Sequence, residues 1–338
     1  MPDRSEQRIL LAHGGGGVLM RELVADIVSR IGTGAGGALQ DSAVLPVEKG
    51  RIAFTTDTFV VSPLFFPGGD IGRLAVCGTV NDLAVCGARP LYLSLSLVIE
   101  EGFPVSSLVR IVDSIAATAD EAAVTVVTGD TKVVERGKGD GLFINTSGIG
   151  VVPDGVELSS AAARPGDLVL VNGPIGEHGL AILSRREGID FGGELRSDTA
   201  PLSNVIVPLL RETVGIRGMR DATRGGLAAV LNEMAADSRV CIRIEEEAVP
   251  ISASVRAGCE LMGYEPLHIA NEGKFVAVVD RNRAEEVLAF LKGNPLGRGA
   301  AVIGEVLGEP GGCVVVKTPF GGERVLDLPY GDLLPRIC

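Results

Sequence analysis

Segments with the pattern of strands and segments with the pattern of helices alternate along almost the whole chain, and this alternation limits the fold more than any other feature. Strands are expected where apolar and polar residues alternate between Gly- or Pro-rich turns, as in RIAFTTDTF at 51–59, PLYLSLSLVIE at 90–100 and GLFINTSGIGVV at 141–152. An amphipathic helix is expected between two of them, at 106–122. Such alternation is typical of α/β folds, in which helices cover the faces of β-sheets.

Local start and stop signals refine some of these elements. A helix is expected at 70–90, because Asp70 stands in the position of an N-cap and Gly and Pro follow the helical pattern as stop signals. The segment AVTVVTGDTKVV at 123–134 is expected to be a strand that breaks at Gly129. In the second half, LHIANEGKFVAVVD at 267–280 is expected to be a strand.

A run rich in turn-forming residues, VVPDGVELSSAAARPGD at 151–167, divides the alternating pattern into two halves. A chain of 338 residues is long enough for two domains of ordinary size, each with its own core. We therefore expect one domain at 43–154 and a second at 155–328. A glycine-rich segment with a helix precedes them at 1–42, and a tail follows at 329–338.

Composition and charge exclude several classes of partner. The formal net charge is −12, no basic run is present, and aromatic residues make up only 4%, so a nucleic-acid-binding surface is not expected. No apolar run approaches the roughly 18 residues that a transmembrane helix needs, and the N-terminal residues do not resemble a secretory signal. The six cysteines form no close pairs, which favours reduced thiols and a cytoplasmic location.

Two glycine-rich motifs are candidates for phosphate-binding loops. The segment GTGAGG at 32–37 matches G-x-G-x-x-G, but it follows an expected helix and not a strand, so the dinucleotide-binding context is missing. The segment HGGGG at 13–17 lacks the G-K-[ST] of a Walker loop. Two interpretations of it stay open: a flexible run whose backbone N–H groups close over phosphates, or a mobile linker.

Several aspartates stand beside small or polar residues, either at expected strand ends or next to glycines. They are Asp41, Asp57, Asp82, Asp130 and Asp221. Lone carboxylates are usually solvated, but a set of this kind supplies the oxygen ligands that Mg²⁺ shares with substrate phosphates. The segment TRGGLA also places Arg224 and two backbone amides at an expected helix N-terminus, where anions bind. The residues alone therefore point to a possible Mg-nucleotide enzyme.

The chain resembles the HypE family of hydrogenase maturation factors in a series of blocks that appear in that family's order. The blocks are the segments 55–90, VTGDTKVV at 127–134, DATRGGLA at 221–228, NEGK at 271–274 and the final PRIC at 335–338. The similarity runs from His13 to Cys338. One departure is Ala222, where the family pattern leads us to expect proline, and we expect this change to loosen the turn.

The resemblance implies a fold. HypE belongs to the superfamily of AIR synthetase, which also holds selenophosphate synthetase and thiamine-monophosphate kinase. We therefore expect a mixed α/β (α+β) chain of two AIR-synthetase-like domains with a flexible C-terminal tail. The N-terminal domains of two protomers should pair into an intersubunit β-barrel in a homodimer, and the alternation in LYLSLSL supplies the two faces that a barrel strand needs.

The resemblance also implies a function for Cys338. By itself a cysteine at the last position indicates nothing, but in HypE-like proteins this thiol carries the substrate. The partner HypF loads it with a carbamoyl group, ATP drives dehydration of the S-carboxamide to an S-cyanide, and the cyanide passes to iron on the HypC–HypD complex. The cofactors implied are ATP and Mg²⁺.

Site residues follow from the same resemblance, position by position. The expected metal ligands are Asp57, Asp82, Asp130 and Asp221, with Asp41 a weaker candidate. The expected nucleotide contacts are Thr56, Asp57, Asn81, Gly129, Asp130, Thr131 and Arg224. Glu272 is the expected proton acceptor, and Lys132 is expected to orient the thiocarboxamide. The alternative for Glu272 and Lys132 is a structural ion pair or plain surface charge.

Two other functions stay open at this point. A small-molecule kinase or synthetase of the same superfamily, of the selenophosphate synthetase or thiamine-monophosphate kinase type, would share the aspartates without needing Cys338. A non-catalytic scaffold for HypC- or HypF-type partners would need neither ATP nor the carboxylates, and their presence in every expected block argues against it.

Overall fold

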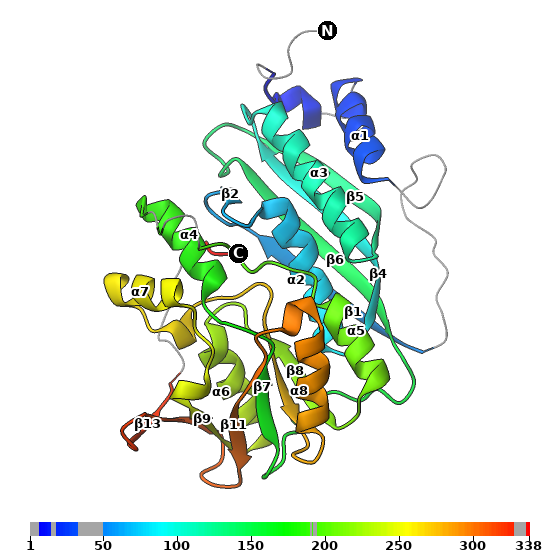
Figure 1. Cartoon of the computed structure of the whole chain (residues 1–338). Coiled ribbons are helices and arrows are strands. Elements are labelled where there is room, and N and C mark those ends of the chain that lie inside the picture. Colours follow the sequence, from blue (N-terminus) through cyan, green and yellow to red (C-terminus); the bar gives the residue numbers. More distant parts are fainter. Residues whose placement is uncertain (1–6, 15–17, 33–49, 190, 192–194, 328–335) are drawn as a thin grey trace.

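The computed structural model describes residues 7–14, 18–32, 50–189, 191, 195–327 and 336–338. Asp41 and most of both glycine-rich motifs therefore lie outside the described residues. The described chain forms two α/β bodies that lie against each other, with the N-terminal helix α1 at the end farthest from the second body (Figure 1).

The first body is built on a sheet whose described strands run in the order β1-β6-β4-β5. Its strands are β1 (Arg51–Phe59), β4 (Arg89–Glu100), β5 (Thr125–Val134) and β6 (Leu142–Val152). Strand β6 is antiparallel to both β1 and β4, and β4 is parallel to β5. A short hairpin of β2 (Phe65–Phe66) and β3 (Gly69–Asp70) precedes the main helix.

Helices α2 (Ile71–Val85) and α3 (Val105–Glu121) cover one face of this sheet, and α1 (Val18–Ile31) packs outside α3 (Figure 1). The predicted N-cap is confirmed: the Asp70 carboxylate accepts hydrogen bonds from the N–H groups of Gly72 and Arg73. Almost all of α2 is buried, because it also contacts β8 (Ile216–Asp221) and α5 (Ser203–Glu212) of the second body. It is therefore a structural link between the two bodies.

On β1 the side chains alternate between the two faces of the sheet. Thr55 and Asp57 are partly buried, whereas Ile52 and Phe54 are 58% and 69% exposed. Two large apolar side chains on one exposed sheet face are the feature expected of a surface that another chain covers.

The second body has a mixed sheet whose described strands run in the order β13-β12-β9-β11-β7-β10-β8. The five residues of β10 (Phe275–Val279) are all buried, and they alternate between two cores. Phe275, Ala277 and Val279 meet α5 (Ser203–Glu212) and α8 (Ala284–Gly293), while Val276 and Val278 meet α6 (Gly226–Ser238). A strand buried on both faces marks the centre of a three-layer domain.

The remaining elements complete this body and its link to the first. The strands are β7 (Leu168–Val171), β8 (Ile216–Asp221), β9 (Cys241–Glu245), β11 (Ala301–Leu307), β12 (Cys313–Lys317) and β13 (Glu323–Val325). The helices are α4 (Glu177–Glu187) and α7 (Ala253–Met262). The short 3₁₀ turns are Leu11–Gly14, Glu246–Ala248, Pro266–His268 and Pro295–Gly297. Helices α4 and α7 pack together, and α4 also reaches the core of the first body through Ile182 and Leu183.

Two expectations about strands were wrong. Strand β5 does not break at Gly129 but runs through it, and the glycine is needed because a Cβ there would lie 2.2 Å from the carbonyl oxygen of Leu95 on β4. The strand expected at 267–280 is confined to β10, because the residues before it form a loop that turns towards the first body. The mixed α/β class and the two-body organisation are as expected. In the described part of the chain, no helix is long and apolar enough to cross a membrane.

Candidate active site

Three of the predicted aspartates come together where the two bodies meet. Asp57 is on β1, Asp82 is on α2, and Asp221 is the last residue of β8. Thr55 donates a hydrogen bond of 2.7 Å to the Asp82 carboxylate, which fixes its orientation towards β1. The Asp82 charge is close enough to raise the pKa of both Asp57 and Asp221. We call these three residues the acidic cluster.

The acidic cluster resists full ionisation. Burial and the neighbouring Asp82 charge raise the pKa of Asp57 to about 6, and Arg224 only partly offsets this. Burial, with the Asp82 and Asp57 charges, raises the pKa of Asp221 to about 7. Three carboxylates without enough positive charge around them form a site that a cation would stabilise.

The acidic cluster suits a cation that arrives with a ligand. Among the described residues, no three His, Cys, Asp or Glu side chains converge closely enough to hold a metal ion by themselves. Magnesium usually takes only one or two protein carboxylates and completes its octahedron with water and substrate phosphates. The cluster therefore fits an ion shared with a nucleotide better than a permanent structural metal.

Glu272 lies beside the cluster and is only 2% exposed. Burial raises its pKa well above the ordinary value, and the charges of Asp221, Asp198, Asp57 and Asp82 add to the effect. Its Oε1 atom has no hydrogen-bond partner among the described residues. A buried carboxyl with an unsatisfied oxygen is costly, so this group is a strong candidate for contact with a bound molecule.

The backbone of Glu272 is held from both bodies. Its N–H donates to Asp198, and its carbonyl accepts from the side chain of Asn81 on α2. The Asn81 amide also donates to Ala200, and its oxygen accepts from the N–H of Leu202. Asn81 is 1% exposed, and both its amide nitrogen and its amide oxygen are hydrogen-bonded in these contacts. In the structure it therefore links the two bodies. Its assignment to the nucleotide stays a prediction.

The loop before α6 differs from expectation in two details. Ala222 was expected to loosen the turn, but its N–H donates a 2.9 Å hydrogen bond to the carbonyl of Lys274, a bond that proline cannot make. Of the two glycine amides expected to be open to an anion, that of Gly226 donates to the carbonyl of Thr223. Arg224 is exposed and lies close enough to Asp57 to lower its pKa, so it remains placed for an anion at the cluster.

Other predicted residues lie away from the cluster within one chain. One row of paired residues crosses the sheet from Asp57 through Thr146 and Leu95 to Gly129. Three strand spacings separate its ends, which is about 14 Å. The block Gly129, Asp130, Thr131 and Lys132 thus occupies the opposite edge strand. Thr56 alternates with Asp57 and lies on the opposite face of β1, hydrogen-bonded to Ser147.

The last three residues of the sequence are seated in the protein. Ile337 is 2% exposed and belongs to the core of the first body, and Cys338 is half-buried against the same core. The N–H groups of Val60 and Ser62, which follow β1, donate to the carbonyls of Cys338 and Arg336. This antiparallel pairing extends the strand that carries Asp57, so the thiol-bearing residue lies at the end of that strand.

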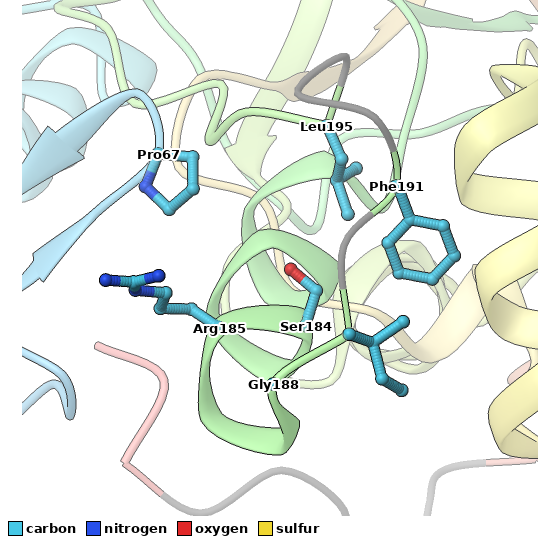
Figure 2. A pocket seen from close by; sticks show the side chains of 7 residues that line it. Pro67, Ser184, Arg185, Gly188, Phe191 and Leu195 are labelled. Atoms are coloured by element: carbon cyan, nitrogen blue, oxygen red, sulfur yellow. The ribbon is translucent and has the colours of Figure 1, made fainter.

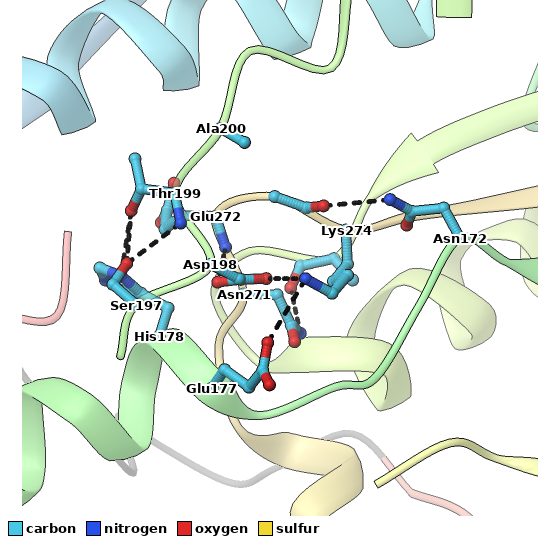
Figure 3. A network of polar contacts seen from close by, with 12 residues as sticks. Asn172, Glu177, His178, Ser197, Asp198, Thr199, Ala200, Asn271, Glu272 and Lys274 are labelled. Atoms are coloured by element: carbon cyan, nitrogen blue, oxygen red, sulfur yellow. Dashed lines mark hydrogen bonds and ion pairs between the residues drawn. The ribbon is translucent and has the colours of Figure 1, made fainter. Parts of the chain in front are cut away.

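A buried polar network, not predicted from the sequence, supports the back of the site. Figure 3 shows Asp198 between Lys274 and the backbone of Glu272, with Glu177 on the other side of the Lys274 ammonium. Although burial opposes it, the Lys274 charge and the N–H of Glu272 together lower the pKa of Asp198. Glu272 and Lys274 belong to the recognised block NEGK, but no local motif marks Asp198 or His178.

A separate cavity of about 270 Å³ lies beyond the C-terminal end of α4 (Figure 2). Its lining residues are Pro67, Ser184, Arg185, Gly188, Ile189, Phe191 and Leu195. None of them belongs to the acidic cluster, so we do not assign the predicted chemistry to this cavity.

Comparison with known proteins identifies the family of the chain. Residues 39–152 match the family of AIR synthase related proteins, N-terminal domain, and residues 164–317 match the C-terminal domain of the same family. The carbamoyl dehydratase HypE of Rhizobium leguminosarum bv. viciae is 51% identical over 338 residues, which cover 99% of this chain and 97% of that protein. This chain belongs to the HypE family.

Solved HypE structures share the whole architecture. A structure of HypE in complex with ATP superposes with a TM-score of 0.94 at 45% identity, covering 97% of this chain and 99% of that one. A structure of a HypE–HypF complex gives a TM-score of 0.80 at 47% identity, covering 93% and 100% of the two chains. The two-domain AIR-synthetase-like fold of this chain is thus the fold of the HypE family.

Proposed function

We propose that this protein is an ATP-dependent carbamoyl dehydratase of [NiFe] hydrogenase maturation, which converts an S-carbamoyl group on Cys338 into an S-cyanide. One observation carries the proposal: the segment ending in Cys338 docks beside β1, and the same strand holds Asp57 of the acidic cluster. The chain is 51% identical to a protein named carbamoyl dehydratase HypE, and this similarity favours the proposed function over that of a small-molecule kinase or synthetase. Such an enzyme would have no use for a seated terminal thiol.

The reaction balances as a phosphorylation followed by an elimination. The carbonyl oxygen of R–S–C(=O)–NH₂ attacks the γ-phosphorus of ATP, and the bond to ADP breaks. The C–O bond of the phosphorylated intermediate then breaks, phosphate leaves, and both N–H protons are lost to give R–S–C≡N. The net products are ADP, phosphate, one proton and the S-cyanide. Catalysis of this kind depends on positioning and on neutralising phosphate charge.

The acidic cluster is the part of the site that suits the triphosphate. A Mg²⁺ ion bound by Asp57, Asp82 or Asp221 would neutralise phosphate charge. Arg224 supplies a positive group on the same side, as its effect on Asp57 indicates. The crowding of negative charge in the acidic cluster, which raises the pKa of Asp57 and of Asp221, is the property that supports this assignment.

Glu272 is the proposed proton acceptor. It is buried next to the cluster, has an unpaired carboxyl oxygen, and is held by its backbone from both bodies. Three of the four carboxylates that raise its pKa belong to the cluster. Neutralisation of these three by a bound cation would lower that pKa and let Glu272 take a proton from the substrate nitrogen.

We further propose that a second copy of the chain supplies Gly129, Asp130, Thr131 and Lys132. In a closed intersubunit barrel the edge strands β1 and β5 must find partners, and β5 of one protomer closing against β1 of the other brings this block to the cluster. The exposed Ile52 and Phe54 support such an interface. In that arrangement Asp130 adds a carboxylate and Lys132 lies near the thiocarboxamide.

Partners and location follow from the carrier role of Cys338. A HypF-type carbamoyltransferase must load the thiol, so the tail must leave its seat, and a HypC–HypD-type complex must receive the cyanide. Because a free thiol is required, we propose a reducing, cytoplasmic location. None of the six cysteines forms a disulfide, as is usual in such a compartment.

The proposal is tested by mass spectrometry of the intact protein. The chain is incubated with a HypF-type transferase, carbamoyl phosphate and ATP, and Cys338→Ala serves as the matched control. We expect the mass of one carbamoyl group to be gained and then one water to be lost, with both changes confined to the peptide that holds Cys338. Loading without loss of water in the presence of Mg-ATP would show that the chain is a carrier only.

A further inference from the structure

The seat of the last three residues is made by contacts from separate elements. The Arg336 carbonyl accepts from the N–H of Ser62 and from the guanidinium of Arg186 on α4, at 3.1 and 3.0 Å. The Arg336 side chain pairs with Asp140 at 2.7 Å. The Ile337 carbonyl accepts from Nε2 of His178 at 2.9 Å. The final residue is thus placed by its two predecessors and by the hydrogen bond from the N–H of Val60 to its own carbonyl.

His178 is the most buried of these contacts. It lies in the first turn of α4, is fully buried, and its ring forms a T-shaped pair with the ring of Phe66, with centroids 5.6 Å apart. A carbonyl oxygen can only accept, so Nε2 carries the proton. Burial lowers the pKa of His178, so the ring is neutral and its Nδ1 is an acceptor. Ser197 is therefore the donor in the 2.8 Å contact with Nδ1.

The segment 197–200 connects this histidine to the proposed proton acceptor (Figure 3). The hydroxyls of Ser197 and Thr199 lie on the side of His178, and the Thr199 N–H donates to the Ser197 oxygen. Between them, the Asp198 carboxylate points the other way and accepts from the N–H of Glu272 and from Lys274. Four consecutive residues thus touch both the holder of the tail and the backbone of Glu272.

We propose that His178 is a positioning residue that holds the Cys338 carrier segment in register with Glu272 for the dehydration step, a role that rests on the proposed function. The histidine contacts neither reacting atom. It acts through the Ile337 carbonyl on one side and through segment 197–200 on the other. A misplacement of about 1 Å at a reacting group is enough to cost about 100-fold in rate.

The test compares two polar substitutions of the same residue. In His178→Gln the side-chain amide nitrogen reaches the position of Nε2 and can donate to Ile337. In His178→Asn the amide ends at the position of Nδ1 and cannot. Both keep a polar group in the buried site, and a thermal melt checks that each is folded.

Two readouts are measured, of which the first needs no partner. Alkylation of Cys338 by iodoacetamide is followed on the Asp-N peptide DLLPRIC, with exposed Cys86 as the internal control. Loss of one hydrogen bond should speed alkylation of Cys338 about fivefold in His178→Asn, and Cys86 should not change. The second readout is the dehydration rate of protein already loaded with carbamoyl, which should fall at least about tenfold in His178→Asn. In His178→Gln both values should stay within about twofold of the parent, since the hydrogen bond to the Ile337 carbonyl is kept.

The outcomes separate this inference from the proposed function. If both variants match the parent in both readouts, His178 does not position the tail. If His178→Gln and His178→Asn are both folded and show equal changes in the alkylation and dehydration rates, the ring acts only by packing. The proposed role of its hydrogen bond is then wrong. If the parent protein never forms an S-cyanide, the proposed function fails, while the alkylation readout still decides whether His178 holds the tail.

Discussion

Glu272 lies between two groups of carboxylates that differ in how their charge is balanced. On one side, Asp198 is paired with Lys274 at 2.9 Å and accepts the N–H of Glu272. On the other side, Asp57, Asp82 and Asp221 lie close together, and Arg224 near Asp57 and Arg220 near Asp221 offset their negative charge only in part. In the first group the pKa of Asp198 is lowered, whereas in the second the pKa values of Asp57 and Asp221 are raised. A carboxylate whose charge is balanced within the chain stabilises the fold, whereas a group with excess like charge is suited to binding a cation.

The largest effect on stability should come from breaking the balanced group. Asp198→Asn leaves the Lys274 ammonium in a site where its side chain is only 11% exposed, with Glu177 3.6 Å away as the remaining partner. Removing one member of a buried pair typically costs about 3–5 kcal/mol. Urea unfolding at neutral pH measures this loss, and Asp280→Asn, at a more exposed pair with Arg217, is the control. A loss below that of the control would show that Asp198 is not structural.

The residue between the groups should affect chemistry and not folding. Glu272→Gln replaces a carboxyl whose pKa burial raises with a neutral group of the same shape, so the melting temperature should barely change. Carbamoyl loading takes place on the partner and should be normal. Dehydration should slow by about 100-fold or more, as expected for loss of a general base. S-cyanide formation at the parent rate would make Glu272 purely structural.

We predict that Asp130 of the other protomer completes the acidic cluster. Asp82→Asn and Asp130→Asn are each expected to lose ATP turnover while remaining folded. If the site takes Asp82 from one chain and Asp130 from its partner, an equal mixture re-equilibrated as dimers should recover about a quarter of parent activity, because half the dimers are mixed and each mixed dimer has one intact site. If both residues serve the same chain, mixing restores nothing.

The smallest effect should be the change in protein stability caused by a substitution in the acidic cluster. Asp82→Asn removes a charge that raises the pKa of both Asp57 and Asp221. The free energy of unfolding without ligand should therefore be unchanged or higher by up to about 1 kcal/mol. Urea titration beside Asp198→Asn checks this directly. A loss of several kcal/mol in Asp82→Asn would mean that the two groups do not differ as described.

Local signals predicted the elements of the first body well, and the reason is physical. The Asp70 cap and the alternation of β1, β4 and β6 are short-range patterns that the tertiary structure keeps. Gly129 misled because glycine is read as a break, whereas the observed requirement is the close approach of Leu95 from the neighbouring strand. Helix α5 was missed, since Pro208 lies inside it and no side chain caps it.

The site was predictable only where a recognised block carried it. Asp57, Asp82 and Asp221 stand in such blocks, and the structure brings them together with Glu272. His178 meets Ile337 across 159 positions of sequence, and Asp198 meets Lys274 across 76. Contacts of this range depend on how the two bodies pack, and neither residue lies in a pattern with a chemical meaning of its own.

The seated Arg336–Cys338 segment has a consequence for competition. Because it is tethered to the body that binds it, the segment meets its seat at an effective concentration on the order of millimolar. A free peptide ending in Arg-Ile-Cys would have to exceed that concentration to displace it, so the protein is protected from most other thiols. A loading enzyme faces the same competition and captures the tail only during the intervals when it is undocked. The strength of the seat therefore sets how often the carrier can be handed over, and a tighter seat would favour dehydration at the expense of loading.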